Sequence, residues 1–146
     1  MGKVNRLAMA ESAMRVILEF SEAFNRHDLP GMARLLSSEC LLDSAVPAPG
    51  GTAYTGKEAV MQFWQGFFEQ HPQARLEIEE IFGFGERGVL RWKRRQAGTA
   101  GYLRGAEIFR VKNDLICEQH SYVKGSYAQT YESGIEKYIS PDRTAR

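Results

Sequence analysis

Two residues in the second half of the sequence have side chains suited to proton transfer near neutral pH, Glu107 and His120. The sequence around Glu107 alternates as in a strand, which places its carboxyl on the same face as Phe109 and Val111. An apolar environment penalises the charged carboxylate and raises its pKa, so Glu107 is a candidate general acid or hydrogen-bond donor. A buried ion pair with an arginine such as Arg91 is an equally weighted structural alternative.

His120 is the second candidate, because an unperturbed imidazole has a pKa of about 6.5. Alternation along the strand expected over 115–124 gives two sets of side chains, one with His120 and Tyr122 and the other with Gln119 and Ser121. Hydrophobicity does not choose between the two sets. If the first set faces inward, His120 can shuttle protons beside Glu107. Geometry alone favours a purely structural histidine.

Asp43 is the third catalytic candidate. It closes a short apolar run, 40–42, directly before a loop rich in proline and glycine. This position lies at a pocket mouth if the sheet curls over the helices. The alternative is an aspartate that starts a turn through local hydrogen bonds, which is at least as common.

No motif in the sequence indicates a metal or a cofactor. Cys40 and Cys117 have no C-x-x-C spacing and no neighbouring histidines, so we expect reduced core cysteines rather than a zinc site. A phosphate-binding glycine loop and the G-x-S-x-G motif are also missing from the sequence. The function classes that remain are catalysis without a cofactor and ligand binding without catalysis.

Apolar residues spaced by three, four and seven predict three helices in the first half of the sequence. The first covers about 10–27, and the second covers 30–37 with Asp28 as its N-cap. The third begins at a capping box formed by Thr55 and Glu58 and ends before Pro72.

The third helix has an aromatic face that we interpret mainly as cover for the core, because burial of one helix face requires this spacing. Stacking on a cofactor is the less favoured alternative. The residues of this face are Val60, Phe63, Trp64, Phe67 and Phe68.

From about residue 74 the apolar period changes from 3.6 to 2, which indicates strands. Short polar or glycine-bearing separators favour hairpins and therefore an antiparallel meander. Helices followed by strands predict an α+β fold rather than an alternating parallel sheet. The expected strands cover 74–84, 89–96, 102–112 and 115–124.

The length of 146 residues fits one domain over 1–146, with a core at about 10–125 and a C-terminal extension over 126–146. Nineteen Lys and Arg against 18 Asp and Glu give a net charge of +1, without the field of a nucleic-acid binder. No signal peptide and no 18-residue apolar window are visible. We therefore expect a cytoplasmic protein with a small-molecule partner, and neither nucleic acid nor membrane.

Three segments, in their order and spacing, resemble SnoaL-like proteins of the nuclear transport factor 2 superfamily. They are FSEAFNRHDLPGMARLLSSECLLDSA, TGKEAVMQFWQGFF and GAEIFRVKNDLICEQHSYVKG, and the resemblance covers roughly 16–124. It implies a cone in which a curved antiparallel sheet wraps three N-terminal helices, a cystatin-like α+β roll with a pocket inside. It also implies a homodimer formed through the sheets.

Function transfers less directly, because this superfamily includes cyclases, isomerases, epoxide hydrolases, dehydratases and noncatalytic proteins. By resemblance to ketosteroid isomerase, the oxyanion-hole tyrosine falls on Phe20, which donates no hydrogen bond. The general-base aspartate falls on Ser44, with Asp43 on the opposite strand face. The protonated aspartate falls on Glu107, the one functional position that is kept. Steroid isomerisation of the known kind is therefore not expected.

The similarity to polyketide cyclases is looser, but the residues contradict it less than they contradict the similarity to ketosteroid isomerase. Polyketide cyclases use an acid–base carboxylate or histidine in the cone. This similarity implies a small apolar or polyketide-like ligand and proton transfer by Glu107 and His120, as in a cyclase, isomerase or dehydratase. The alternative is a noncatalytic small-molecule-binding or dimerisation module. The residues expected to line the pocket are Phe20, Phe24, Phe63, Trp64, Phe67, Trp92, Phe109 and Tyr122.

Overall fold

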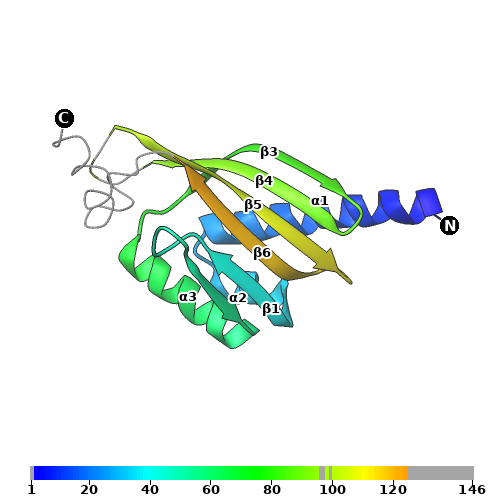
Figure 1. Ribbon diagram of the computed structural model, residues 1–146, viewed down its shortest axis with the longest axis horizontal. Helices are drawn as coiled ribbons and strands as arrows, with labels where there is room; N and C mark the ends of the chain where they lie inside the picture. The colour runs from blue at the N-terminus through cyan, green and yellow to red at the C-terminus, as the bar shows by residue number, and fades with distance from the viewer. Residues whose placement is uncertain (1, 96–97, 99, 125–146) are drawn as a thin grey trace.

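Three helices and one six-stranded sheet make up the described part of the chain and confirm the α+β class (Figure 1). The computed structural model describes residues 2–95, 98 and 100–124, and for residues 2–10 it describes the backbone alone. The expected extension over 126–146 lies outside this range. The elements are α1 (Gly2–Asn25), α2 (Leu29–Arg34), β1 (Leu36–Ser44), β2 (Thr52–Thr55), α3 (Lys57–Gln70), β3 (Leu76–Phe84), β4 (Arg87–Arg95), β5 (Tyr102–Lys112) and β6 (Leu115–Lys124).

The sheet has the strand order β2-β1-β6-β5-β4-β3. Strands β3 to β6 form the predicted antiparallel meander, and β2 pairs with β1 in the same sense. One pair differs from the expected all-antiparallel sheet, because β1 lies parallel to β6. Parallel neighbours need a long crossover, and the chain from β2 through α3 to β5 provides it.

Local boundaries differ from the sequence predictions where strand pairing takes precedence. The expected capping box is wrong, because Thr55 is the last residue of β2 and pairs with Leu41. Gly56 is the N-cap of α3 instead, with φ 94°, and no side chain caps that end. The N-cap of α2 is confirmed, since Asp28 accepts a hydrogen bond from Gly31 N at 3.0 Å.

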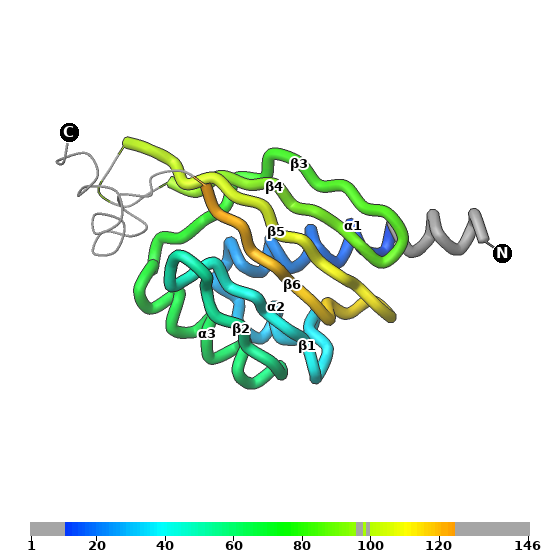
Figure 2. The backbone as a smooth tube through the Cα atoms, in the orientation of Figure 1, coloured from blue at the N-terminus to red at the C-terminus, as the bar shows by residue number. Residues whose placement is uncertain are grey.

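The core lies between α1, α3 and the concave face of the sheet, and Figure 2 shows α1 running across β3, β4 and β5. Phe24 of α1 meets Trp64 and Phe68 of α3 at ring-centroid distances of 5.6 and 5.1 Å. This packing confirms that the aromatic face of α3 covers the core. Within the described residues, no helix has the length and apolar character needed to cross a membrane.

Candidate functional site

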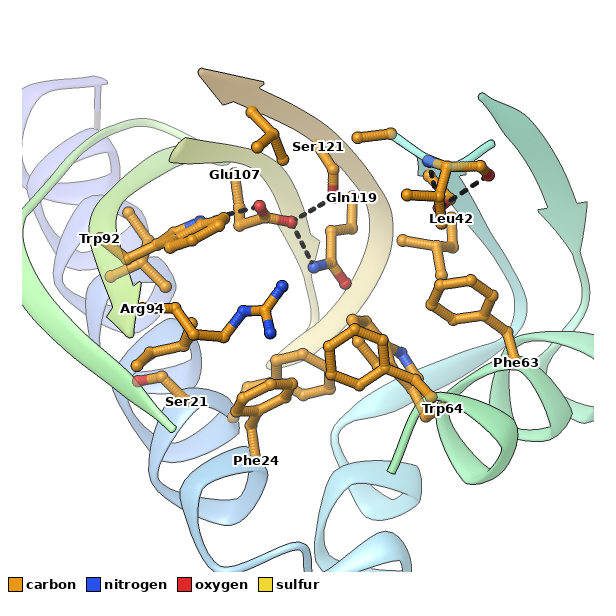
Figure 3. Close-up of a pocket in the computed structure, with 18 residues that line it drawn as sticks. Ser21, Phe24, Leu42, Phe63, Trp64, Trp92, Arg94, Glu107, Gln119 and Ser121 are labelled. Atoms are coloured by element: carbon orange, nitrogen blue, oxygen red, sulfur yellow. Dashed lines mark hydrogen bonds between the residues drawn. The ribbon is translucent and has the colours of Figure 1, made fainter. Parts of the chain in front are cut away.

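A pocket opens between the concave face of the sheet and helices α1 and α3 (Figure 3). It encloses a volume of about 100 Å³, which becomes about 720 Å³ when the open space at its mouth is included. Its wall is mainly aromatic and aliphatic, with a few polar groups from the sheet. The lining residues are Phe20, Ser21, Phe24, Leu42, Ser44, Ala45, Val46, Phe63, Trp64, Phe67, Leu76, Leu90, Trp92, Arg94, Glu107, Gln119, Ser121 and Val123.

Glu107 of β5 lies in this wall, is 7% exposed, and is held by donors from both neighbouring strands. Trp92 Nε1 on β4 donates to Oε2 at 2.9 Å, and Gln119 Nε2 on β6 donates to Oε1 at 2.8 Å. Ser121 Oγ also donates to Oε1. The alternative pairing with Arg91 is wrong, because that side chain bonds Glu79 and Glu80 instead.

The protonation of Glu107 depends on two opposing effects. Burial raises the pKa of the Glu107 carboxyl, and the hydrogen bonds from Ser121, Gln119 and Trp92 counteract part of that rise. A carboxyl group has about four lone-pair positions, so three donors leave one acceptor position, on Oε2. The neutral form carries its proton there and can donate one hydrogen bond.

A bulge in β6 decides which of its side chains face the pocket. Arg110 pairs with Glu118, but the next residue of β5, Val111, pairs with Ile116. Cys117 is therefore an extra residue, and the alternation changes face there. Ile116 and Gln119 both point inward although three positions separate them. Neither of the two alternating sets considered from the sequence describes the whole strand.

His120 consequently lies on the outer face of the sheet, and the prediction that it joins Glu107 is wrong. Its Nδ1 lies 3.1 Å from Oδ2 of Asp43, and its Nε2 lies 3.2 Å from Oε1 of Glu118. The hydrogen bond with Asp43 raises the pKa of His120, burial lowers it, and Glu118 adds to the rise. Asp43 faces outward too, so its expected position at the pocket mouth is also wrong.

The predicted lining aromatics divide into three groups. Six of them lie in the pocket wall: Phe20, Phe24, Phe63, Trp64, Phe67 and Trp92. Phe109 was expected there but is buried behind the wall, where its ring packs edge-on against Phe20. Tyr122 is a second correction, because it shares the outward face of His120 and is 58% exposed.

The polar lining residues that were not predicted as site residues include Gln119, Ser121 and Arg94. Gln119 and Ser121 were concealed by the bulge at Cys117, which no pattern in the sequence marks. Arg94 is not singled out by the sequence patterns above, although it stands two positions after Trp92 and therefore shares its inward face. That spacing was the available signal.

No group of three or more His, Cys, Asp or Glu among the described residues is arranged to hold a metal ion. The positions that correspond to the functional residues of ketosteroid isomerase lie where the sequence comparison indicates. Ser44 lies in the pocket wall with Phe20, whereas Asp43 points to the other face of β1.

The sequence profile of the SnoaL-like domain matches residues 17–119. A solved NTF2-like protein of unknown function from Mesorhizobium loti is 33% identical, with a TM-score of 0.71, and the match covers 80% of this chain and 93% of that one. No curated protein sequence matches the chain.

Two further solved structures show the same fold at low identity. A proposed ketosteroid isomerase from Kribbella flavida is 14% identical, with a TM-score of 0.69 over 81% of this chain and 82% of that one. A proposed polyketide cyclase from Sinorhizobium meliloti is 14% identical, with a TM-score of 0.64 over 74% and 94%. The profile match covers more than half of the sequence, and the chain therefore belongs to the SnoaL-like domain family.

Proposed function

We propose that this protein binds a small, largely apolar molecule in the cone pocket. The observation that carries the proposal is a mainly apolar wall around one buried, hydrogen-bonded carboxyl, Glu107. Apolar walls supply affinity through burial, and a few fixed polar groups orient the ligand. The three donors hold the Glu107 carboxyl in place before any ligand arrives.

Binding can be tested with a neutral aromatic probe, 2-naphthol, in thermal-shift and calorimetric titrations. Val46 lines the pocket and is 43% exposed, so Val46→Trp is expected to narrow the mouth without disturbing the core. Leu18 of α1 is 41% exposed and does not line the pocket, so Leu18→Trp is the matched control. We expect binding to be weakened in the first variant only. Equal binding by both variants, or none by the unmodified protein, would contradict the proposal.

A second candidate function is proton transfer by Glu107 alone. It is favoured by the raised pKa of the Glu107 carboxyl and by the free position on Oε2. A neutral carboxyl can donate to a ligand carbonyl and stabilise the enol or enolate that forms when water takes a proton from the adjacent carbon, a step common to cyclisation and isomerisation. The earlier hypothesis of a Glu107 and His120 pair is not retained, because the two side chains lie on opposite faces of the sheet.

This second function is tested with 2-tetralone in deuterated water, by following exchange of the protons next to its carbonyl with NMR. We expect faster exchange with the unmodified protein than with Glu107→Gln, because the amide is a far weaker acid. Equal rates for the two proteins would leave binding without catalysis as the function.

We also propose that the protein is a homodimer that associates through the outer face of the sheet. Phe82 of β3 and Tyr122 of β6 are exposed on that face, as expected of an unpartnered contact surface. Light scattering after size exclusion should give twice the mass of a single chain. Phe82→Lys should reduce the measured mass toward that of a single chain. A single chain mass for the unmodified protein would contradict this.

We propose that the protein is located in the cytoplasm. Cys40 and Cys117 are free cysteines, which suits a reducing compartment. Fractionation of the producing cells would test it, and recovery of the protein outside the cytoplasm would contradict it.

A further inference from the structure

Arg94 of β4 places a cation in the wall of the pocket without an acidic partner among the described residues. Figure 3 shows its guanidinium reaching toward the middle of the cavity. It lies over the ring of Phe67, 5.4 Å from the ring centroid, and makes no hydrogen bond or ion pair within the described part of the chain. Arg87 and Arg91 of the same strand do have acidic partners, and both of these side chains point to the outer face of the sheet.

Glu107 does not neutralise Arg94, although both line the same pocket. The two side chains form no ion pair, and the Glu107 oxygens accept hydrogen bonds from Trp92, Gln119 and Ser121 instead. Burial favours the neutral carboxyl, whereas a guanidinium stays protonated in proteins. Among the described lining residues, Arg94 is therefore a positive charge without an ion-pair partner in a mainly apolar space.

Two further polar atoms of the lining have no hydrogen-bond partner among the described residues. Trp64 Nε1 is a buried donor, and Gln119 Oε1 is a buried acceptor in a side chain that is 4% exposed. Unsatisfied buried polar atoms are costly and uncommon, and here both lie in the wall of one pocket.

We propose that the ligand of this pocket is a small apolar molecule with one carboxylate, which Arg94 binds. This inference rests on the proposed binding function and names its ligand class. A guanidinium presents parallel N–H groups that match the two oxygens of a carboxylate. One guanidinium also balances one negative charge, whereas a doubly charged phosphate would leave a charge uncompensated in the apolar pocket.

The test compares two probes of nearly equal shape, 2-naphthoate and its neutral amide 2-naphthamide, by calorimetry with the full chain at neutral pH. We expect the carboxylate to bind the unmodified protein about ten-fold or more tightly than the amide, as for hydrogen bonds to a charged group. In Arg94→Met this preference should disappear while the amide affinity stays the same. Unchanged amide binding also shows that the variant keeps its pocket.

Arg91→Met is the matched control, because it removes the same charge from the same strand on the outer face. Its carboxylate preference should equal that of the unmodified protein. Equal affinity of the unmodified protein for both probes, or a preference that survives in Arg94→Met, would overturn the carboxylate inference alone. Binding of neither probe would overturn the proposed function together with it.

Discussion

Glu107 is the residue at which burial and hydrogen bonding oppose each other most directly. Its carboxyl joins β4, β5 and β6 through Trp92, Gln119 and Ser121, so it organises the pocket wall whether or not it transfers a proton. Arg94 lies in the same wall and has no ion-pair partner among the described residues. The chemical character of the pocket depends on these two side chains.

The pH dependence of folding should identify the protonation state of Glu107. Burial raises the pKa of the folded carboxyl above its ordinary value of 4.5, so its stabilising contribution is present below that pH. It is lost as the pH rises through the folded pKa. Urea titrations should therefore show the unmodified protein losing stability relative to Glu107→Gln as the pH rises from about 4.5. A constant difference between the two would contradict the raised pKa.

His120, on the outer face of the sheet, makes a second pH-dependent contribution to the stability of the fold. Its pKa is raised above 6.5 mainly by Asp43, so its contribution is complete below that value and disappears at higher pH. His120→Gln should destabilise the protein by a few tenths to about 1 kcal/mol near pH 5.5 and by less near pH 8.5. Asp43→Asn should weaken the same pH dependence. The measurement is urea unfolding of the three proteins at both pH values.

At the scale of elements, the position of the Trp92 indole depends on a glycine in the neighbouring strand. Gly105 of β5 pairs with Trp92 of β4, and an added Cβ would overlap the indole and lie 2.6 Å from the carbonyl oxygen of Tyr122. The strand pair therefore has room for the indole only because position 105 has no side chain. Through this contact the glycine also positions the donor to Glu107.

Gly105→Ala should destabilise the protein by about 1–3 kcal/mol, as overpacking does in cores, and alter the near-UV circular dichroism of Trp92. Gly66→Ala in α3 is the opposite case, because nothing lies within 4 Å of the added Cβ. It should stabilise the helix by about 0.5–1 kcal/mol. Urea unfolding measures both changes, and a neutral Gly105→Ala would show that the strands can shift apart.

For the whole molecule, the sheet and α1 depend on a shared aromatic contact behind the pocket. Phe109 is 1% exposed and its ring meets Phe20 of α1 at 6.2 Å. Phe109→Ala should cost about 3–5 kcal/mol, a large part of the stability of a domain this size. Gln65→Ala at an exposed position of α3 should change stability by less than about 0.5 kcal/mol. Comparable losses in both variants, measured by thermal and urea unfolding, would contradict this division of core and surface.

Much of the architecture could be predicted from the sequence because local physics encodes it. The boundaries of β5 and β6 follow from the period of two and from the turns that flank them, and they match the structure at both ends. The N-cap at Asp28 and the aromatic face of α3 follow from equally local rules. Glu107 could be placed on an inward face because β5 alternates without interruption.

The sequence by itself thus determined the fold class, most of the elements and one buried carboxyl, since each depends on near neighbours in the chain. Only the tertiary structure decided that β1 lies parallel to β6, that a bulge at Cys117 turns His120 outward and Gln119 inward, and that Arg94 faces the pocket unpaired. The physical reason is that strand register and pairing depend on backbone hydrogen bonds between distant segments. A one-residue change of register reverses every side chain that follows.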